Sequence, residues 1–185
     1  GTKEFREIIG ELACILCYHA LSDAKLKEIE IETPICKTKV NILDEDNYAF
    51  VPILRVGTGM LNGLISMIPN AKIGHIGLYR NEETLEPTMY YYKMPKNISK
   101  KEVIILDPML ATGGSATDTI KMLKKDGVKK IKFLCIIAAP EGIERLQKEY
   151  PDVKIFTACI DETLNEKGYI VPGLGDAGDR IFGTK

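Results

Sequence analysis

The feature that most constrains the fold is a series of short apolar runs alternating with amphipathic segments. The runs have the length of strands, but they lack the apolar–polar alternation of a strand with one wet face. They lie at residues 48–56, 71–80, 101–107, 129–140 and 153–160, with helical patterns at 59–69, 115–127 and around 143–150. Strands that are apolar on both faces belong to parallel sheets covered by helices on both sides. The sequence therefore predicts an α/β fold with a mostly parallel central sheet.

The length and the charge exclude several classes of protein. The 185 residues suit one domain, spanning residues 1–185, with a sizeable core. Lysine and arginine total 25 against 26 aspartates and glutamates, so no net field favours nucleic acid or a membrane surface. No apolar run has the length of a membrane span. The first residue is Gly1 rather than Met, and we expect a preceding segment to have been truncated or processed.

The five cysteines indicate a reducing, cytoplasmic setting, because their number is odd and their spacing irregular. Cys14 and Cys17 form a C-x-x-C pair, which raises the question of metal or redox chemistry. They lie within a helical pattern with one apolar face, however, and no second pair completes a zinc site. Core packing is the better prediction. A structural role is likewise predicted for the two histidines, His19 and His75, which are far apart in sequence.

The stretch "DPMLATGGS", residues 107–115, joins a predicted strand to a predicted helix and contains two adjacent glycines. Gly113 and Gly114 allow the backbone to curl so that its N–H groups converge, and together with the helix N-terminus they favour an anion such as phosphate. Thr112 and Ser115 add hydroxyl donors. Asp107, acceptor-only when ionised, suits sugar hydroxyls. The pattern predicts a site for a phosphorylated ribose. The alternative is an ordinary N-cap after a flexible turn, with Asp107 solvated.

Two arginines are placed like Asp107, at or near the ends of predicted strands. Arg55 and Arg80 fall there, and ligands of parallel sheets bind beyond the carboxyl ends of the strands. A guanidinium group offers forked donors that match phosphate oxygens, so both arginines are candidates for a diphosphate. The glycines after Arg55, in "GTGMLNG", do not form a dinucleotide fingerprint, because Asn62 stands where the third glycine is needed.

Here the sequence resembles a known family. "VIILDPMLATGGSATDTI" resembles the phosphoribosyl pyrophosphate (PRPP) motif of phosphoribosyltransferases, in the form that the uracil phosphoribosyltransferase family uses, with Pro108 after the acid. "FVPILRVGTGM", "HIGLYRNEETLEP" and "GYIVPGLGDAGDRIFGTK" are similar to that family in the same order. Val56 and Thr58 depart from the Ala and Leu expected after Arg55, which bears on loop packing more than on chemistry. The family usually carries an extra N-terminal segment.

The resemblance assigns roles to individual residues. It implies PRPP contacts at Arg55, Arg80, Asp107, Pro108, Met109, Leu110, Ala111, Thr112, Gly113, Gly114, Ser115 and Asp176. It implies uracil contacts at Ile170, Gly175, Asp176 and Ala177, with Asp107 and Asp176 as the catalytic candidates. Mg²⁺ is the implied cofactor, held through PRPP and water rather than by direct protein ligands. Without the resemblance, the glycine-rich tail is typical of a long coil packed over the sheet.

The resemblance also implies a β-hairpin arm after Arg80, a C-terminal base-binding segment and a homodimer or higher homo-oligomer, and it leaves room for a GTP effector. The arm falls at residues 81–92; alternatively, Tyr90, Tyr91 and Tyr92 simply pack a strand. "KKDGVKKIK", residues 124–132, is better explained as a solvated helix end and strand start than as a nucleic-acid patch.

The implied activity is the salvage reaction of uracil with PRPP, giving UMP and pyrophosphate. The expected partners are those two small molecules, with no nucleic acid and no membrane. A regulatory module that senses PRPP or UMP and binds RNA is an alternative from a different class, although the sequence supplies little basic surface for it. A phosphoribosyltransferase for another base, such as a purine, is the third hypothesis, and Pro108 and the tail stand against it.

Overall fold

The protein is described from a computed structural model covering residues 1–80 and 87–184, without the side chains of Arg80 and Pro87. One sheet organises the molecule. Its strands are β3 (Tyr48–Leu54), β4 (Lys72–Ile73), β5 (His75–Arg80), β6 (Pro87–Lys93), β7 (Glu102–Leu106), β8 (Met109–Leu110), β9 (Lys130–Ala138) and β10 (Lys154–Ile160). The main order is β10-β9-β7-β3-β5-β6, with β4 paired to β3 and β8 to β9. Every pairing is parallel except that of β5 with the edge strand β6, so the predicted sheet type is confirmed.

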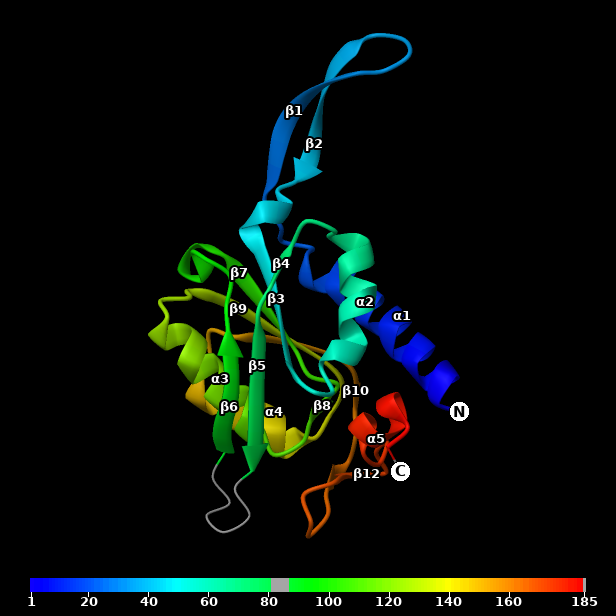
Figure 1. Ribbon diagram of the computed structural model, residues 1–185, viewed down its shortest axis with the longest axis vertical. Coiled ribbons are helices and arrows are strands. Elements are labelled where there is room, and N and C mark those ends of the chain that lie inside the picture. Colours follow the sequence, from blue (N-terminus) through cyan, green and yellow to red (C-terminus); the bar gives the residue numbers. More distant parts are fainter. Residues whose placement is uncertain (81–86, 185) are drawn as a thin grey trace.

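Helices cover both faces of this sheet (Figure 1). They are α1 (Thr2–Ala20), α2 (Thr58–Met67), α3 (Gly114–Lys125), α4 (Pro140–Glu149) and α5 (Ala177–Phe182), with short 3₁₀ turns at Glu45–Asn47 and Ile98–Lys100. Residues of α3 and α4 join one apolar cluster, and residues of α1, α2 and α5 join the cluster on the other face.

The two clusters explain the unbroken apolar runs. Along β7, Val103 and Ile105 pack toward α3, whereas Ile104 and Leu106 pack toward α1 and α2. All four side chains are fully buried. Because successive side chains of a strand point to opposite faces, a strand with helices on both sides must be apolar at every position.

The C-x-x-C pair lies in α1, as predicted. Cys17 is buried in the core cluster, where burial raises the pKa of its thiol to about 12, so it stays protonated and unreactive. Cys14 is partly buried. Within residues 1–80 and 87–184, no group of three or more His, Cys, Asp or Glu side chains is placed to hold a metal ion. No helix in those ranges is both long and apolar enough to cross a membrane.

A second hairpin was not predicted. Strands β1 (Leu26–Glu32) and β2 (Lys37–Leu43) pair antiparallel and project from the body as an arm (Figure 1). The sequence feature that could have predicted this hairpin is the alternation in "KEIEIE", residues 27–32, which is typical of a strand with one polar face.

The arm predicted after Arg80 is only partly described. Its loop, residues 81–86, lies outside the described residues, but the flanking strands β5 and β6 do pair antiparallel. On β6, Tyr92 packs against the core and its hydroxyl lies 2.5 Å from a carboxylate oxygen of Asp126. The ring of Tyr90 covers Gly77 on β5. These two tyrosines therefore pack the strand, as the alternative reading held.

Candidate active site

A cavity of about 320 Å³ lies where the carboxyl ends of the strands meet the C-terminal segment. It collects three stretches that are distant in sequence, lined by Arg55, Val56, Met109, Ala111, Gly168, Tyr169, Ile170, Gly175, Asp176, Ala177 and Gly178. Seven of these eleven are site residues predicted from the sequence: Arg55, Met109, Ala111, Ile170, Gly175, Asp176 and Ala177. A larger cavity of about 540 Å³ lies at the opposite edge of the sheet and contains none of the predicted residues.

The glycine turn has the backbone that the phosphate hypothesis requires. Gly113 caps the N-terminus of α3 with a φ of +77°, a left-handed conformation that a residue with a Cβ adopts at a cost. Helix α4 packs closely behind this turn. A Cβ at Gly142 would lie 2.3 Å from the carbonyl oxygen of Ala111. A guanidinium nitrogen of Arg145 donates to the carbonyl oxygen of Thr112 over 3.4 Å. The turn is thus held in place by α4 through Gly142 and Arg145.

Asp107 follows the last residue of β7 and is 9% exposed. Burial raises the pKa of its carboxyl group to about 7, although the backbone N–H of Met109, 3.3 Å from Oδ1, opposes the rise. The alternative of a solvated Asp107 does not fit this burial. A carboxyl group in this environment gains from hydrogen-bond donors brought by a ligand, and sugar hydroxyls are such donors.

Arg55 comes directly after β3, and the peptide bond that precedes it is cis. The turn that it begins packs tightly on β7, since a Cβ at Gly57 would lie 2.3 Å from the carbonyl oxygen of Leu106. Its guanidinium carbon lies 5.5 Å from the ring centroid of Phe182 in α5. Arg80 is the last residue of β5, but its side chain is outside the described part, so its diphosphate contact remains a prediction.

The C-terminal segment, residues 163–182, supplies one side of the cavity. Strand β11 (Thr163–Leu164) pairs antiparallel with β12 (Ile170–Val171), and the chain then turns into α5. Gly175 has a φ of +73°, and the side chains of Ile170 and Ala177 are buried. Asp176 is the N-cap of α5, where its Oδ1 accepts a hydrogen bond of 2.9 Å from the N–H of Asp179. That oxygen therefore has a structural role at the start of α5.

Seven of the other predicted PRPP residues do not line the cavity: Asp107, Pro108, Leu110, Thr112, Gly113, Gly114 and Ser115. The Leu110 side chain is buried in the core, so only its backbone is available to a ligand. Four lining residues were not predicted as site residues: Val56, Gly168, Tyr169 and Gly178. Arg145, which contacts the glycine turn outside the cavity, was not predicted either. Tyr169 lines the cavity, and its position directly before Ile170 was the available signal. Arg145 had no signal, because only the packing of α4 brings it to Thr112.

Comparison with known proteins decides the family. The family model described as uracil phosphoribosyltransferase matches residues 1–184. The chain belongs to the uracil phosphoribosyltransferase family. Curated members named uracil phosphoribosyltransferase from Clostridium perfringens (strain SM101 / Type A) and Clostridium botulinum (strain Eklund 17B / Type B) are 57% and 58% identical. Both alignments cover all of this chain and 88% of the relative. The predicted family is confirmed.

Solved structures agree with this placement. The structure of AQ2163 protein from Aquifex aeolicus is 45% identical, with a TM-score of 0.93, over all of this chain and 88% of that one. A purine phosphoribosyltransferase from Pyrococcus horikoshii is 17% identical, with a TM-score of 0.53, over 83% of this chain and 87% of that one. The second likeness shows the phosphoribosyltransferase fold alone. The purine hypothesis and the regulatory RNA-binding alternative find no support in the family model or the curated relatives.

Proposed function

We propose that this member of the uracil phosphoribosyltransferase family transfers the 5-phosphoribosyl group of PRPP to N1 of uracil. The observation that carries the proposal is the composition of one cavity. Arg55 and Ala111, from the two segments expected to bind PRPP, line it together with Ile170 and Ala177, from the segment expected to bind the base. A transferase needs both substrates in one site, because orienting them together removes much of the entropic barrier.

PRPP would bind along the edge of the sheet. The turn from Ala111 to Ser115 would hold the 5′-phosphate on its backbone N–H groups, with Asp107 accepting from the ribose hydroxyls. Arg55 would hold the pyrophosphate, with Arg80 as its expected counterpart. The support for this arrangement is the left-handed Gly113 at the start of α3 and the burial of Asp107.

The few carboxylates of the predicted site suit a Mg²⁺ ion that binds together with PRPP. Asp107 and Asp176 are the carboxylates of the predicted site, and residues 1–80 and 87–184 hold no cluster of three or more acidic or other ligating side chains. Mg²⁺ is commonly bound by one or two carboxylates plus substrate phosphates, with several waters retained. When bound, it would neutralise charge on the diphosphate.

Uracil would be read mostly by the backbone. The segment around Ile170 and Gly175 has few reactive side chains, and backbone N–H groups can face the O4 carbonyl of uracil but not the amino group of cytosine. Sites that depend on such hydrogen bonds reach a discrimination of roughly 10⁴ or more.

The reaction is a substitution at C1 of ribose. The bond from C1 to the pyrophosphate oxygen breaks with its electron pair on oxygen. N1 of uracil forms the new bond, and its proton passes to water or to a nearby base. The protein would contribute orientation, and Arg55, which lines the cavity, would stabilise the charge of the leaving group. Asp176 is a weak candidate for a general base, because one of its oxygens caps α5.

Product analysis tests the proposal. Purified protein with Mg²⁺ and PRPP is incubated with uracil, cytosine, orotate or hypoxanthine. We expect UMP with uracil and no nucleotide with the other bases. Nucleotide from hypoxanthine instead would place the chain among purine enzymes. No product from any base, in a protein with a folded circular dichroism spectrum, would contradict the proposed activity.

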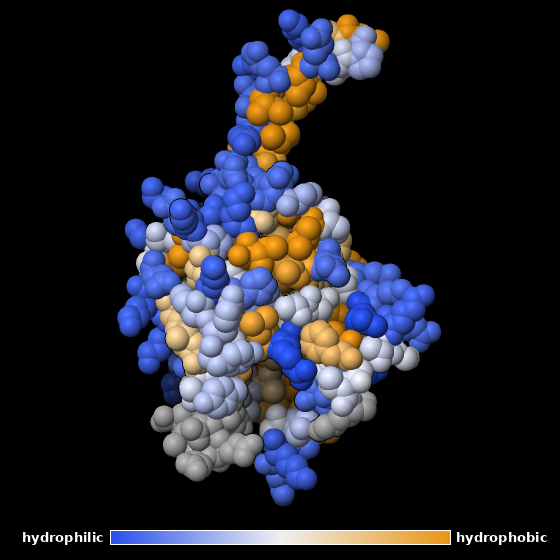
Figure 2. Space-filling model, viewed as in Figure 1, coloured by the Kyte–Doolittle hydropathy of each residue, from blue (hydrophilic) through white to orange (hydrophobic). Residues whose placement is uncertain are grey.

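We also propose that the protein assembles with copies of itself through the β1–β2 arm. Every residue of both strands is exposed or only partly buried, and an isolated two-stranded hairpin is marginally stable in water. Apolar surface runs along the arm (Figure 2), and Ile35 at its tip is 91% exposed. A second copy of the chain would cover both arms by symmetry.

Light scattering after size-exclusion chromatography measures the assembly. We expect a mass of at least two chains, falling toward one in the double variant Ile35→Ser/Ile42→Ser. Glu30→Gln, which leaves the apolar surface of the arm intact, should keep the larger mass. A monomeric parent chain would overturn this proposal without touching the proposed reaction.

A cytoplasmic location remains a further proposal, supported by five cysteines that are all free thiols.

A further inference from the structure

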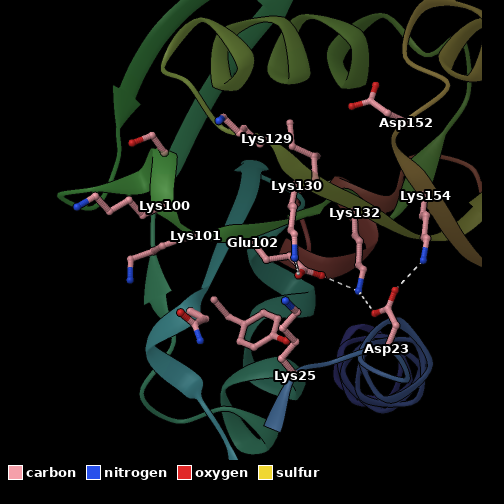
Figure 3. Close-up of a pocket in the computed structure, with 14 residues that line it drawn as sticks. Asp23, Lys25, Lys100, Lys101, Glu102, Lys129, Lys130, Lys132, Asp152 and Lys154 are labelled. Carbon is pink, nitrogen blue, oxygen red and sulfur yellow. Dashed lines mark hydrogen bonds and ion pairs between the residues drawn. The ribbon is translucent and has the colours of Figure 1, made fainter. Parts of the chain in front are cut away.

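Charged side chains join separate elements at both edges of the sheet. At the amino ends of the parallel strands, the larger cavity of about 540 Å³ surrounds one such junction (Figure 3). Lys132 on β9 contacts Asp23 at 2.5 Å and Glu102 at 2.6 Å, and its side chain is 6% exposed. The prediction that "KKDGVKKIK" is a solvated stretch is therefore wrong for Lys132. This network joins the turn after α1 to β7 and β9, so its role is structural.

At the carboxyl ends of the strands, the start of α4 contacts both segments that are expected to bind the substrates. A Cβ at Gly142 would lie 2.3 Å from the carbonyl oxygen of Ala111, so this end of the helix packs directly on the glycine turn. The residue before it, Glu141, extends to the C-terminal segment. One carboxylate oxygen of Glu141 accepts hydrogen bonds from the Thr163 hydroxyl at 2.9 Å and from the Leu164 N–H at 3.0 Å. Two neighbouring residues of one helix therefore hold the two segments.

The contact of Glu141 extends to the cavity through the pairing of β11 with β12. Strand β11 consists of Thr163 and Leu164, and Leu164 pairs with Ile170 of β12. An isolated pair of strands has little stability of its own, so an outside contact to one strand helps to fix both. Ile170 lines the cavity. The backbone proposed to face uracil is thus one strand away from the Glu141 carboxylate.

The loop between β11 and β12 lies against the glycine turn. Asn165 closes this loop, since its side-chain oxygen accepts hydrogen bonds from the N–H groups of Lys167 and Tyr169, at 2.9 and 3.0 Å respectively. A Cβ at Gly168 would lie 3.5 Å from the methyl carbon of Thr112, an ordinary van der Waals contact. Gly168 and Tyr169 also line the cavity. A shift of β11 would therefore change the spacing between the residues proposed to hold the 5′-phosphate and those proposed to face the base.

Apolar packing also supports these strands. Leu164 and Ile170 pack with Ile137 and Ala139 in a small cluster. Apolar contacts are non-directional, however, whereas a hydrogen bond requires a particular distance and angle. Without the Glu141 contact, we expect the C-terminal segment to stay folded but to be less exactly placed.

The alternative is that Glu141 serves only its own helix. An acid in the first turn of a helix offsets the partial positive charge of the N-terminus, and Glu141 lies in the first turn of α4. Hydrogen bonds from its own backbone N–H, from the Leu164 N–H and from the Thr163 hydroxyl hold the pKa of the Glu141 carboxyl group below its ordinary value. The two roles use the same carboxylate, so substitutions are needed to separate them.

We propose that Glu141 is a positioning residue for the base: it holds β11, and with it the backbone that faces uracil, at the distance from the glycine turn that the transfer requires. This role rests on the proposed function, because it concerns the distance between PRPP and uracil in one cavity. Glu141 itself does not line that cavity, so it acts through β11 rather than by touching a substrate. A displacement of about 1 Å at a reacting centre can cost on the order of a hundredfold in rate.

Two substitutions separate the length of the side chain from its charge. Glu141→Asp keeps the negative charge at the helix start, but its carboxylate is one methylene group short of the Leu164 N–H. Glu141→Gln loses the charge but keeps the length and one carbonyl oxygen, and Thr163 and Leu164 both donate to a single oxygen. We expect Glu141→Asp to lower kcat/KM for uracil about tenfold while KM for PRPP changes less than about twofold, and Glu141→Gln to stay near the parent chain. Glu144→Asp makes the same change at an exposed position of the same helix and should leave both constants unchanged.

Two kinetic outcomes would contradict the proposal. The opposite ranking, with Glu141→Asp like the parent and Glu141→Gln impaired, would show that the charge at the helix start is what matters. Equal rises in KM for both substrates in Glu141→Asp would indicate a general loss of structure instead of a misplaced base.

Hydrogen–deuterium exchange tests the placement without an assay of activity. In Glu141→Asp the amides of β11 and β12 should exchange faster than in the parent, whereas those in the middle of α4 should exchange at the parent's rate. Unchanged exchange in β11 and β12 would overturn the proposal. If the parent chain forms no UMP, the proposed function fails, while this comparison still decides whether Glu141 holds the C-terminal segment.

Discussion

The guanidinium group of Arg55 lies 5.5 Å from the ring centroid of Phe182, which joins the end of β3 to the C-terminal helix. The pair links the arginine proposed to hold pyrophosphate to the helix that follows the proposed base segment. A cation over an aromatic face gains roughly 0.5–1 kcal/mol at a partly exposed site.

Replacing the ring should therefore loosen Arg55. We expect Phe182→Leu to raise KM for PRPP about twofold to fivefold, with a smaller effect on KM for uracil. Steady-state kinetics with each substrate varied in turn measures the difference. Phe182→Tyr keeps an aromatic face and should behave like the parent chain. Equal changes in both KM values for Phe182→Leu would argue that the ring stabilises the whole C-terminal segment rather than Arg55.

Asp107 should make the stability of the ligand-free protein depend on pH. Its pKa is about 7 in the folded protein against 3.8 ordinarily, so between these values the unfolded chain has lost the proton while the folded chain retains it. The free energy of unfolding then falls as pH rises through this window, and the loss is complete above about pH 7. The full shift corresponds to at most about 4 kcal/mol.

Asp107→Asn removes that dependence. Urea unfolding from pH 4 to pH 8 should show the variant gaining stability over the parent as pH rises, while its use of PRPP collapses. A stability difference that stays flat across this range would mean an ordinary pKa for Asp107. An unchanged dependence of rate on PRPP would contradict its assignment to the ribose hydroxyls.

Gly142 should tolerate no side chain. A Cβ there would lie 2.3 Å from the Ala111 carbonyl oxygen and 2.9 Å from that of Leu110, and both are backbone atoms that move only with the turn. We expect Gly142→Ala to cost on the order of 1–3 kcal/mol and to weaken PRPP binding. Gly10→Ala is the matched control, because its Cβ in α1 would meet nothing within 4 Å. That change should stabilise by about 0.5–1 kcal/mol. Thermal melts of both variants would measure the two changes in stability, and PRPP kinetics would show whether only Gly142→Ala raises KM for PRPP.

Thr119 carries a buried hydroxyl without a hydrogen-bond partner among the described residues. Thr119→Val keeps the shape and removes the unsatisfied group, so we expect a gain of about 1 kcal/mol in the free energy of unfolding. Thr117→Val, at another buried threonine of α3, should instead lose stability, because the Thr117 hydroxyl donates to the Gly114 carbonyl at 2.9 Å. Chemical denaturation of both variants checks the opposite signs. A loss for Thr119→Val would reveal a partner for its hydroxyl.

Local patterns predicted much of this molecule. The two-sided apolar runs such as Val103 to Leu106 were sufficient for the parallel sheet, because burial on both faces leaves no polar position. The β1–β2 arm was missed, since its alternation occurs in a stretch too rich in charge to read as part of a core. Arg145 was missed for another reason: its neighbour Thr112 is 33 positions away, and only helix packing makes them adjacent.

The sequence by itself determined the strands and helices of the parallel sheet and the glycine turn after Asp107, because these depend on periodicity and on backbone freedom within a few residues. Only the tertiary structure decided that Arg55, Ala111 and Ile170 line one cavity, and that Lys25, Lys130 and Lys132 line another. The physical reason is the parallel sheet. It sends the carboxyl ends of its parallel strands to one edge and their amino ends to the other, so residues far apart in the chain share a site that no local pattern contains.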